Sequence, residues 1–197
     1  MSFRPAPPAR ALARMFLCTL TLLTAHALGR ALPAAAEPAA APPRVTEPFR
    51  EEHAEIRVHL GHLHQMAGEL RTAASSETPA TMRFVVKFLN EHIRAHAEWE
   101  EQVLYPVVDR LAKGGKEPFT ATMRHEHRIV GRWIDELAAE AAKPVPGVET
   151  FARRTDYLLG LITAHFEEEE EVLLPLIDRG MSAAQFKRDV LDRMKAH

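Results

Sequence analysis

The sequence predicts an all-α protein: an antiparallel up-down four-helix bundle with a short fifth helix at its C-terminus. From residue 47 onward, apolar side chains recur at spacings of three and four along four long segments, which is the period of an amphipathic helix. The alternating β-branched runs that indicate strands do not occur there. Clusters of Pro and Gly separate the segments, and short connections between long helices favour antiparallel neighbours.

The four long helices are expected to end where helix-breaking residues stand. The first ends near Ser75, the second at Gly114, the third before Pro144 and the fourth at Gly180. The expected ranges are 47–74, 79–113, 118–142 and 148–179.

Proline and capping residues refine these boundaries. Pro106 and Pro175 lie inside the second and the fourth helix and are expected to kink them or to split off the last turn. Thr78, which precedes a proline, is the expected N-cap of the second helix. Ser182 and Gln185 form a capping-box pattern that begins the short fifth helix. We expect the apolar face of this last helix to pack across the bundle.

The residues before the bundle are predicted to be a signal peptide, residues 1–36, and a linker, residues 37–46. Basic residues come first, an apolar run up to Leu28 follows, and small residues come next, which is the order of a secretory signal. The protein is therefore expected in the periplasm or outside the cell. The alternative is an uncleaved membrane anchor, although the apolar run is short for a span and contains His26.

Composition limits the kinds of function. The 197 residues suit one domain, 47–197, and a formal net charge of −2 without a basic patch argues against nucleic-acid binding. No stable membrane association is expected once the signal is removed. The single cysteine, Cys18, lies in the predicted signal peptide. Any metal would then be held by His, Glu or Asp, which favours iron, manganese or zinc. Eleven histidines make such a site worth seeking.

An internal repeat carries the candidate ligands. The second and the fourth helix share the pattern H-x-x-x-E-E-x-V-L-x-P without a gap, beginning at His96 and His165. A histidine and the glutamate four residues later lie about 40° apart around a helix, so they face the same side. The pairs are His96 with Glu100 and His165 with Glu169. A carboxylate adds the capacity to bridge two metal ions.

The first and the third helix each add one histidine near their start. His53 follows Glu52, and His127 follows Glu126. The four histidines are each separated by about one helix and its connection, as expected if every helix contributes one inward-facing histidine.

These motifs resemble the hemerythrin-like family, which is named for its His-His-Glu ligand pattern, over roughly residues 47–179. The resemblance implies two non-haem iron ions bridged by oxygen or hydroxide inside a four-helix bundle, with a small gaseous ligand such as dioxygen or nitric oxide. It implies that the histidines are terminal ligands and that the glutamates bridge the irons. The implied metal ligands are His53, His96, Glu100, His127, His165 and Glu169.

The sequence departs from the oxygen-carrying members of that family at one position. They have a second histidine on the third helix at H-x-x-x-H spacing, whereas here Met123 and Gly131 stand four residues before and after His127. His92, one turn before His96, is the alternative source of a further ligand or of a hydrogen bond to one. The departure counts against reversible dioxygen carriage, and in this respect the chain more closely resembles the di-iron proteins implicated in repair of damaged iron–sulfur clusters and related stress-response hemerythrin-like proteins.

The other polar and aromatic residues of these helices receive simpler interpretations. Glu101, Glu170 and their acidic neighbours are expected on the solvated surface, because they lie about 100° farther round the helix than the proposed ligands. Glu98 and Glu168 are the candidates for hydrogen bonds to the ligands. Tyr105 and the tryptophans are expected to fill the core.

Three functions remain open from the sequence. The first is a di-iron protein that binds or senses dioxygen or nitric oxide. The second is a redox enzyme that reduces peroxide, oxygen or nitric oxide, or a related iron-donating stress and repair protein. The third is a metal-storage or structural bundle that holds zinc or manganese.

Overall fold

The computed structural model describes residues 44–73, 75–113, 115 and 117–194. All regular secondary structure in these residues is helical, so the prediction of an all-helical bundle is confirmed. The predicted signal peptide, and the predicted linker up to residue 43, lie outside the described residues. No helix in the described part is long and apolar enough to cross a membrane.

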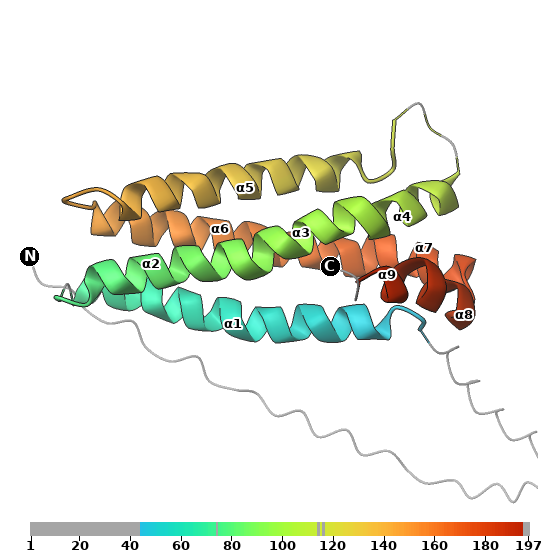
Figure 1. Cartoon of the computed structure of the whole chain (residues 1–197), viewed down its shortest axis with the longest axis horizontal. Coiled ribbons are helices and arrows are strands. Elements are labelled where there is room, and N and C mark those ends of the chain that lie inside the picture. Colours follow the sequence, from blue (N-terminus) through green and yellow to red (C-terminus); the bar gives the residue numbers. More distant parts are fainter. Residues whose placement is uncertain (1–43, 74, 114, 116, 195–197) are drawn as a thin grey trace, which may run out of the picture. The chain divides into compact units, whose positions relative to one another are not determined.

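The helices form four long segments and a short C-terminal one. Contacts join α1 to α6, α6 to α5, α5 to α2 and α2 to α1, and Figure 1 shows successive segments lying alongside one another in opposite directions. The first segment is α1 (Glu47–Thr72); the second is α2 (Thr78–Phe88), η1 (Leu89–Arg94), α3 (Ala95–Trp99), η2 (Glu100–Leu104) and α4 (Tyr105–Ala112); the third is α5 (Ala121–Ala141); the fourth is α6 (Val148–Glu168), η3 (Glu169–Leu173) and α7 (Leu174–Gly180); the last is α8 (Ala183–Phe186), η4 (Lys187–Leu191) and α9 (Asp192–Met194).

Pro106 and Pro175 are accommodated in their helices by π-helical turns that precede them. The segments η1 to η4 are π-helical, and two of them, η2 and η3, stand immediately before the turns that contain Pro106 and Pro175. A proline lacks the N–H of an α-helical hydrogen bond and its ring presses on the carbonyl four residues earlier. A wider turn with i→i+5 hydrogen bonds relieves this contact. The helices therefore continue through both prolines, and the two π-turns begin at the repeated glutamates, Glu100 and Glu169.

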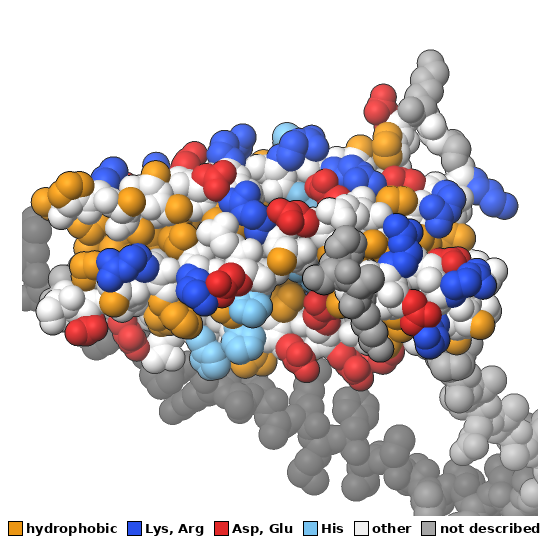
Figure 2. Space-filling view, in the orientation of Figure 1, with side chains coloured by type: hydrophobic (Ala, Val, Ile, Leu, Met, Phe, Trp, Pro, Cys, Tyr) orange, Lys and Arg blue, Asp and Glu red, His pale blue; other side chains and the backbone are white. Residues whose placement is uncertain are grey.

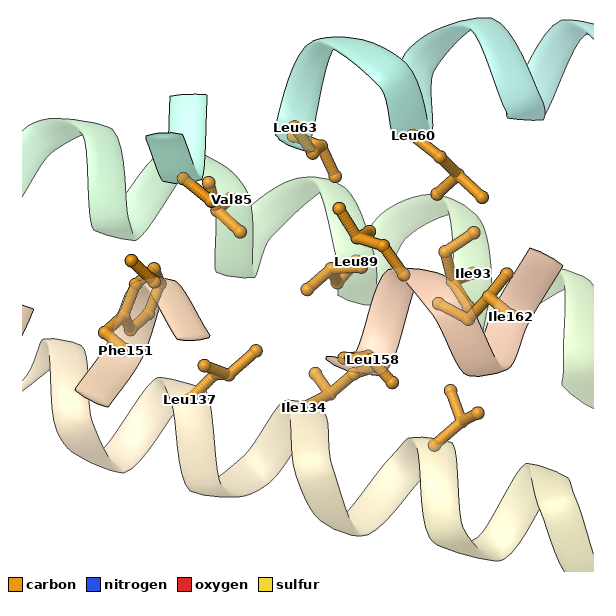
Figure 3. Packing of buried hydrophobic residues seen from close by; sticks show 14 of the residues in the cluster. Leu60, Leu63, Val85, Leu89, Ile93, Ile134, Leu137, Phe151, Leu158 and Ile162 are labelled. Atoms are coloured by element: carbon orange, nitrogen blue, oxygen red, sulfur yellow. The ribbon is translucent and has the colours of Figure 1, made fainter. Parts of the chain in front are cut away.

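Two apolar clusters lie at the two ends of the bundle. The larger one, part of which Figure 3 shows, contains Leu60 and Leu63 of α1 and Ile134 of α5. The smaller one contains Phe49 of α1 and Phe186 of α8. Since α1 contributes to both clusters on either side of His53, that histidine lies at their junction.

The caps of the shorter helices fulfil one expectation and correct another. Ser182 and Gln185 form the predicted capping box, and the tail buries Phe186 and Val190 against the bundle. The predicted N-cap Thr78 is wrong, because it is the first residue of α2 and its hydroxyl oxygen accepts a hydrogen bond from the backbone N–H of Ser75 at 2.9 Å. Its side chain stabilises the preceding turn instead.

Candidate metal centre

The six predicted ligand residues come together between the long segments. His53 comes from α1 and His127 from α5, while the second and the fourth segment each add a histidine and a glutamate. His53, Glu100 and Glu169 are fully buried, and the side chain of His127 is 7% exposed. Polar groups this deeply buried require partners.

The ligand atoms form two groups that share one glutamate. His53, His96, Glu100 and Glu169 form the first group, which we call the His53 half, and Glu100, His127 and His165 form the second, which we call the His127 half. In each half the two histidines bring their Nε2 atoms together, at 3.2 Å for His53 and His96 and at 2.9 Å for His127 and His165.

The two glutamates lie between these halves. Glu100 has its Oε1 2.9 Å from His96 Nε2 and its Oε2 3.2 Å from His127 Nε2. Glu169 has its Oε2 3.6 Å from His53 Nε2 and its Oε1 3.8 Å from His165 Nε2. Each carboxylate thus directs one oxygen toward each half, as a carboxylate bridging two metal ions would.

The unsatisfied polar atoms of the centre fit a cation. Both oxygens of Glu100 and Oε2 of Glu169 are buried without a hydrogen-bond partner among the described residues, although histidine nitrogens lie close to them. A buried carboxylate oxygen left unpaired is strongly unfavourable. Donors that face a common point instead of one another are the arrangement that a metal ion requires. Nitrogen and oxygen donors without sulfur suit iron, zinc or manganese.

A carboxylate from a neighbouring segment faces the outer nitrogen of every histidine. The distances from Nδ1 to the carboxylate oxygen are 3.0 Å for His53 with Glu170, 3.3 Å for His96 with Glu52, 3.2 Å for His127 with Glu101 and 2.7 Å for His165 with Glu126. A carboxylate at Nδ1 holds the imidazole proton there and leaves the Nε2 lone pair directed into the centre.

These four pairs connect the segments in a closed ring. They join α1 to α3, η2 to α5, α5 to α6, and η3 back to α1. The glutamate before each single histidine, Glu52 or Glu126, orients the histidine of the next segment. The glutamate after Glu100 or Glu169, which is Glu101 or Glu170, orients a single histidine. The second glutamate of the repeated pattern therefore supports a histidine of another segment.

The sequence matches the family described as hemerythrin HHE cation binding domain over residues 44–177, which is more than half of the chain and includes all six residues. The chain belongs to this family. The resemblance inferred from the motifs is thereby confirmed. Comparisons with curated proteins and with solved structures give no match.

The supporting carboxylates of this hemerythrin domain correct the sequence interpretation. Glu101 and Glu170 were expected on the solvated surface, but they bind the outer nitrogens of His127 and His53. The rotation of about 100° from the proposed ligands turns these side chains toward the neighbouring helices α5 and α1, which carry His127 and His53, and not out to solvent. Glu98 and Glu168, which were the expected partners, are exposed. The recurring Glu-Glu and Glu-His pairs of the sequence were the available signal.

Other histidines of the hemerythrin domain lie away from the centre. His92 is exposed and its ring packs against Phe88 at 4.4 Å between centroids, so it supplies neither a ligand nor a hydrogen bond to one. His59 and His62 are exposed on α1, and Figure 2 shows histidine side chains gathered on the surface over α1 and the second segment.

Without a cation, the buried ionisable side chains of the hemerythrin domain shift one another's pKa values. Burial alone would lower the pKa of His96, but the Glu100 and Glu52 carboxylates outweigh it and raise this pKa to about 10. Burial would raise the pKa of Glu100, but the charge of His96 holds it well below its usual range. Burial and the charge of Glu100 together raise the pKa of Glu169. The metal-free site thus holds protons that a metal ion would displace.

Proposed function

We propose that this hemerythrin-domain protein binds two non-haem iron ions and that the resulting centre binds or senses a small gaseous ligand, dioxygen or nitric oxide. The observation that carries this proposal is the position of Glu100 and Glu169, each with one oxygen toward either histidine pair. The helical segments, which alternate in direction, support an up-down four-helix bundle as the scaffold. Residues 1–36 are proposed as a signal for export to the periplasm.

The number of available ligands supports a centre with free positions. Each half has two histidines, and one oxygen each of Glu100 and Glu169 is directed toward it, so each metal position has two nitrogens and two oxygens within reach. Iron held by nitrogen and oxygen ligands with open positions supplies the sites at which dioxygen or nitric oxide binds. The residues of the chain would orient the histidines and keep the centre out of bulk water.

A cavity beside the centre supports a small ligand. It borders His96, Glu100, His127 and His165, and its remaining walls are apolar. The apolar lining consists of Ile93, Ala97, Val130, Ile162 and Phe166. Its volume is about 10 Å³, which is room for about one water-sized molecule. An uncharged diatomic molecule suits such a space, and an organic substrate does not.

Metal analysis of the full chain, purified without a histidine tag, tests this proposal. We expect about two iron ions per chain and an optical spectrum that changes when oxygen or nitric oxide is added to the anaerobic reduced protein. Turnover of peroxide or oxygen that depends on iron would instead favour a redox enzyme, and zinc or manganese without ligand binding a storage or structural role. A His96→Ala variant that keeps the full iron content and spectrum would exclude the proposed site.

The ring of supporting carboxylates gives a separate prediction. Glu170→Ala removes the oxygen that orients His53, so the variant should bind iron roughly 10–100-fold more weakly, as is typical when a partner of a metal-binding histidine is lost. Glu171→Ala is the matched control, because Glu171 is the exposed next residue of the same acidic run. Competition with a chelator measures both affinities. Equal iron retention by the two variants would show that the Glu170 contact does not support the centre.

A further inference from the structure

The sequence suggested that Tyr105 only fills the core, but its hydroxyl group lies among the candidate ligands of the metal centre. Its side chain is fully buried at the start of α4. Its hydroxyl oxygen lies 2.8 Å from Glu169 Oε1, 3.2 Å from His127 Nε2 and 3.3 Å from His165 Nε2. Three of its nearest polar atoms therefore belong to proposed metal ligands.

Hydrogen bonding alone does not account for this position. A phenol has one proton, which the Tyr105 hydroxyl donates to Glu169. The carboxylates of Glu101 and Glu126 lie at the Nδ1 atoms of the two imidazoles and favour a proton there, which leaves the Nε2 lone pairs toward the phenol oxygen. The lone pairs on the two Nε2 atoms and on the Tyr105 oxygen repel one another, unless a cation lies among these three atoms.

The distances are those of atoms that share a metal ion. Two ligand atoms that are each about 2.1 Å from a metal lie about 3.0 Å apart when they subtend a right angle. The separation of His127 Nε2 and His165 Nε2 is 2.9 Å, and the Tyr105 oxygen lies within 3.3 Å of both. It occupies the place of one more ligand on the same metal position.

We propose that Tyr105 is a metal ligand of the His127 half and coordinates through its phenolate oxygen. This inference rests on the proposed function, since it requires a metal at that half. On coordination the phenol O–H bond breaks, the oxygen–metal bond forms from an oxygen lone pair, and the proton is released to solvent. No oxidation or reduction is involved.

Neighbouring side chains fix the orientation of the Tyr105 ring and favour a negative charge on it. One face stacks on His127, with ring centroids 5.3 Å apart and an interplanar angle of 14°. The guanidinium of Arg124 lies 5.2 Å from the ring centroid, and a cation there stabilises negative charge on the ring. Arg124 is itself held by hydrogen bonds to Thr120 and Asp109.

A cation bound among the Tyr105 oxygen and the two Nε2 atoms would be the largest charge in the site, and it would favour the deprotonated phenolate oxygen of Tyr105 as a ligand.

Tyr105 also distinguishes the two copies of the sequence repeat. In the pattern H-x-x-x-E-E-x-V-L-x-P the variable residue before proline is Tyr105 in the second segment and Leu174 in the fourth. The His127 half is the one whose helix has Met123 where a further histidine could stand. The phenolate would therefore complete that half, and the two metal positions would be chemically different.

Visible absorption and resonance Raman spectra of the full chain loaded with iron(III) test this assignment. Phenolate bound to iron(III) gives a visible charge-transfer band, and excitation in that band enhances the ring vibrations of the phenolate. We expect both in the wild type and in Tyr157→Phe, whose tyrosine is 62% exposed and is the only other one in the chain. Tyr105→Phe should lose the band and the vibrations while it retains iron in the His53 half.

The outcomes separate this inference from the proposed function. Iron-loaded wild type without phenolate vibrations, or Tyr105→Phe with an unchanged spectrum, would overturn the role of Tyr105 and leave the metal centre intact. Wild type that binds no metal would overturn both. The wild-type Raman spectrum decides even if Tyr105→Phe fails to fold.

Discussion

The variant Glu100→Ala is expected to lose nearly all bound iron, from about two ions per chain to well below one. Glu100 is the residue that the two groups of ligand atoms have in common, so its removal weakens both metal positions at once. Loss of a residue that hydrogen-bonds to a metal ligand already lowers metal affinity about 10–100-fold. Loss of a shared ligand should lower the affinity by more than that at each metal position.

Two comparisons make this prediction specific. His96→Ala removes a ligand of the His53 half alone, so it should retain about one ion per chain. Glu98→Ala changes an exposed residue of the same turn and should retain two. Elemental analysis after dialysis against a weak chelator measures all three variants. Glu100→Ala with the same iron content as His96→Ala would mean that Glu100 serves only one position.

Four of the six candidate ligands could be predicted from the sequence because their signal is local. The pairs His96 with Glu100 and His165 with Glu169 are one helical turn apart and stand in a repeat without a gap. Period alone places both members of a pair on one helix face. The long helices were equally readable, and their observed ends lie within a turn of those expected.

The roles of the supporting glutamates and of Tyr105 could not be predicted from the sequence, because they depend on how neighbouring segments pack. Glu101 and Glu170 lie about 100° round the helix from the proposed ligands, and only the packing decides whether such a position faces solvent or a histidine of another segment. The partner of each histidine lies on another segment, and Glu170 stands 117 positions after His53 in the sequence. The role of Tyr105 likewise appears only when α4, α5 and α6 are packed together.

The second large effect is expected in thermal stability. Iron at a concentration about 1,000 times its dissociation constant stabilises the folded state by roughly 4 kcal/mol. For a domain of this size that corresponds to a rise in Tm of roughly 8–16 °C. The physical reason is the metal-free site, which buries two carboxylates and leaves three of their oxygens unpaired among the described residues. Differential scanning calorimetry of iron-loaded and chelated protein measures the difference.

The variant Glu100→Ala provides the control for this stability prediction. Since it cannot bind iron tightly, its Tm should be nearly the same with and without iron. A wild-type protein whose Tm is unchanged by chelation would show that the buried ligands are stable without a cation. A variant that still gains the full increment would place the stabilising metal elsewhere in the chain.

The increment in Tm should also depend on pH, with a defined sign. In the metal-free protein the pKa of His96 is raised from 6.5 to about 10, so its contribution to stability is complete below about pH 6.5 and falls as pH rises toward 10. Metal binding requires the deprotonated histidine and therefore strengthens over the same range. The difference in Tm between iron-loaded and metal-free protein should widen from about pH 6.5 to about pH 8.5. A difference that narrows with rising pH would contradict the proton displacement that His96 implies.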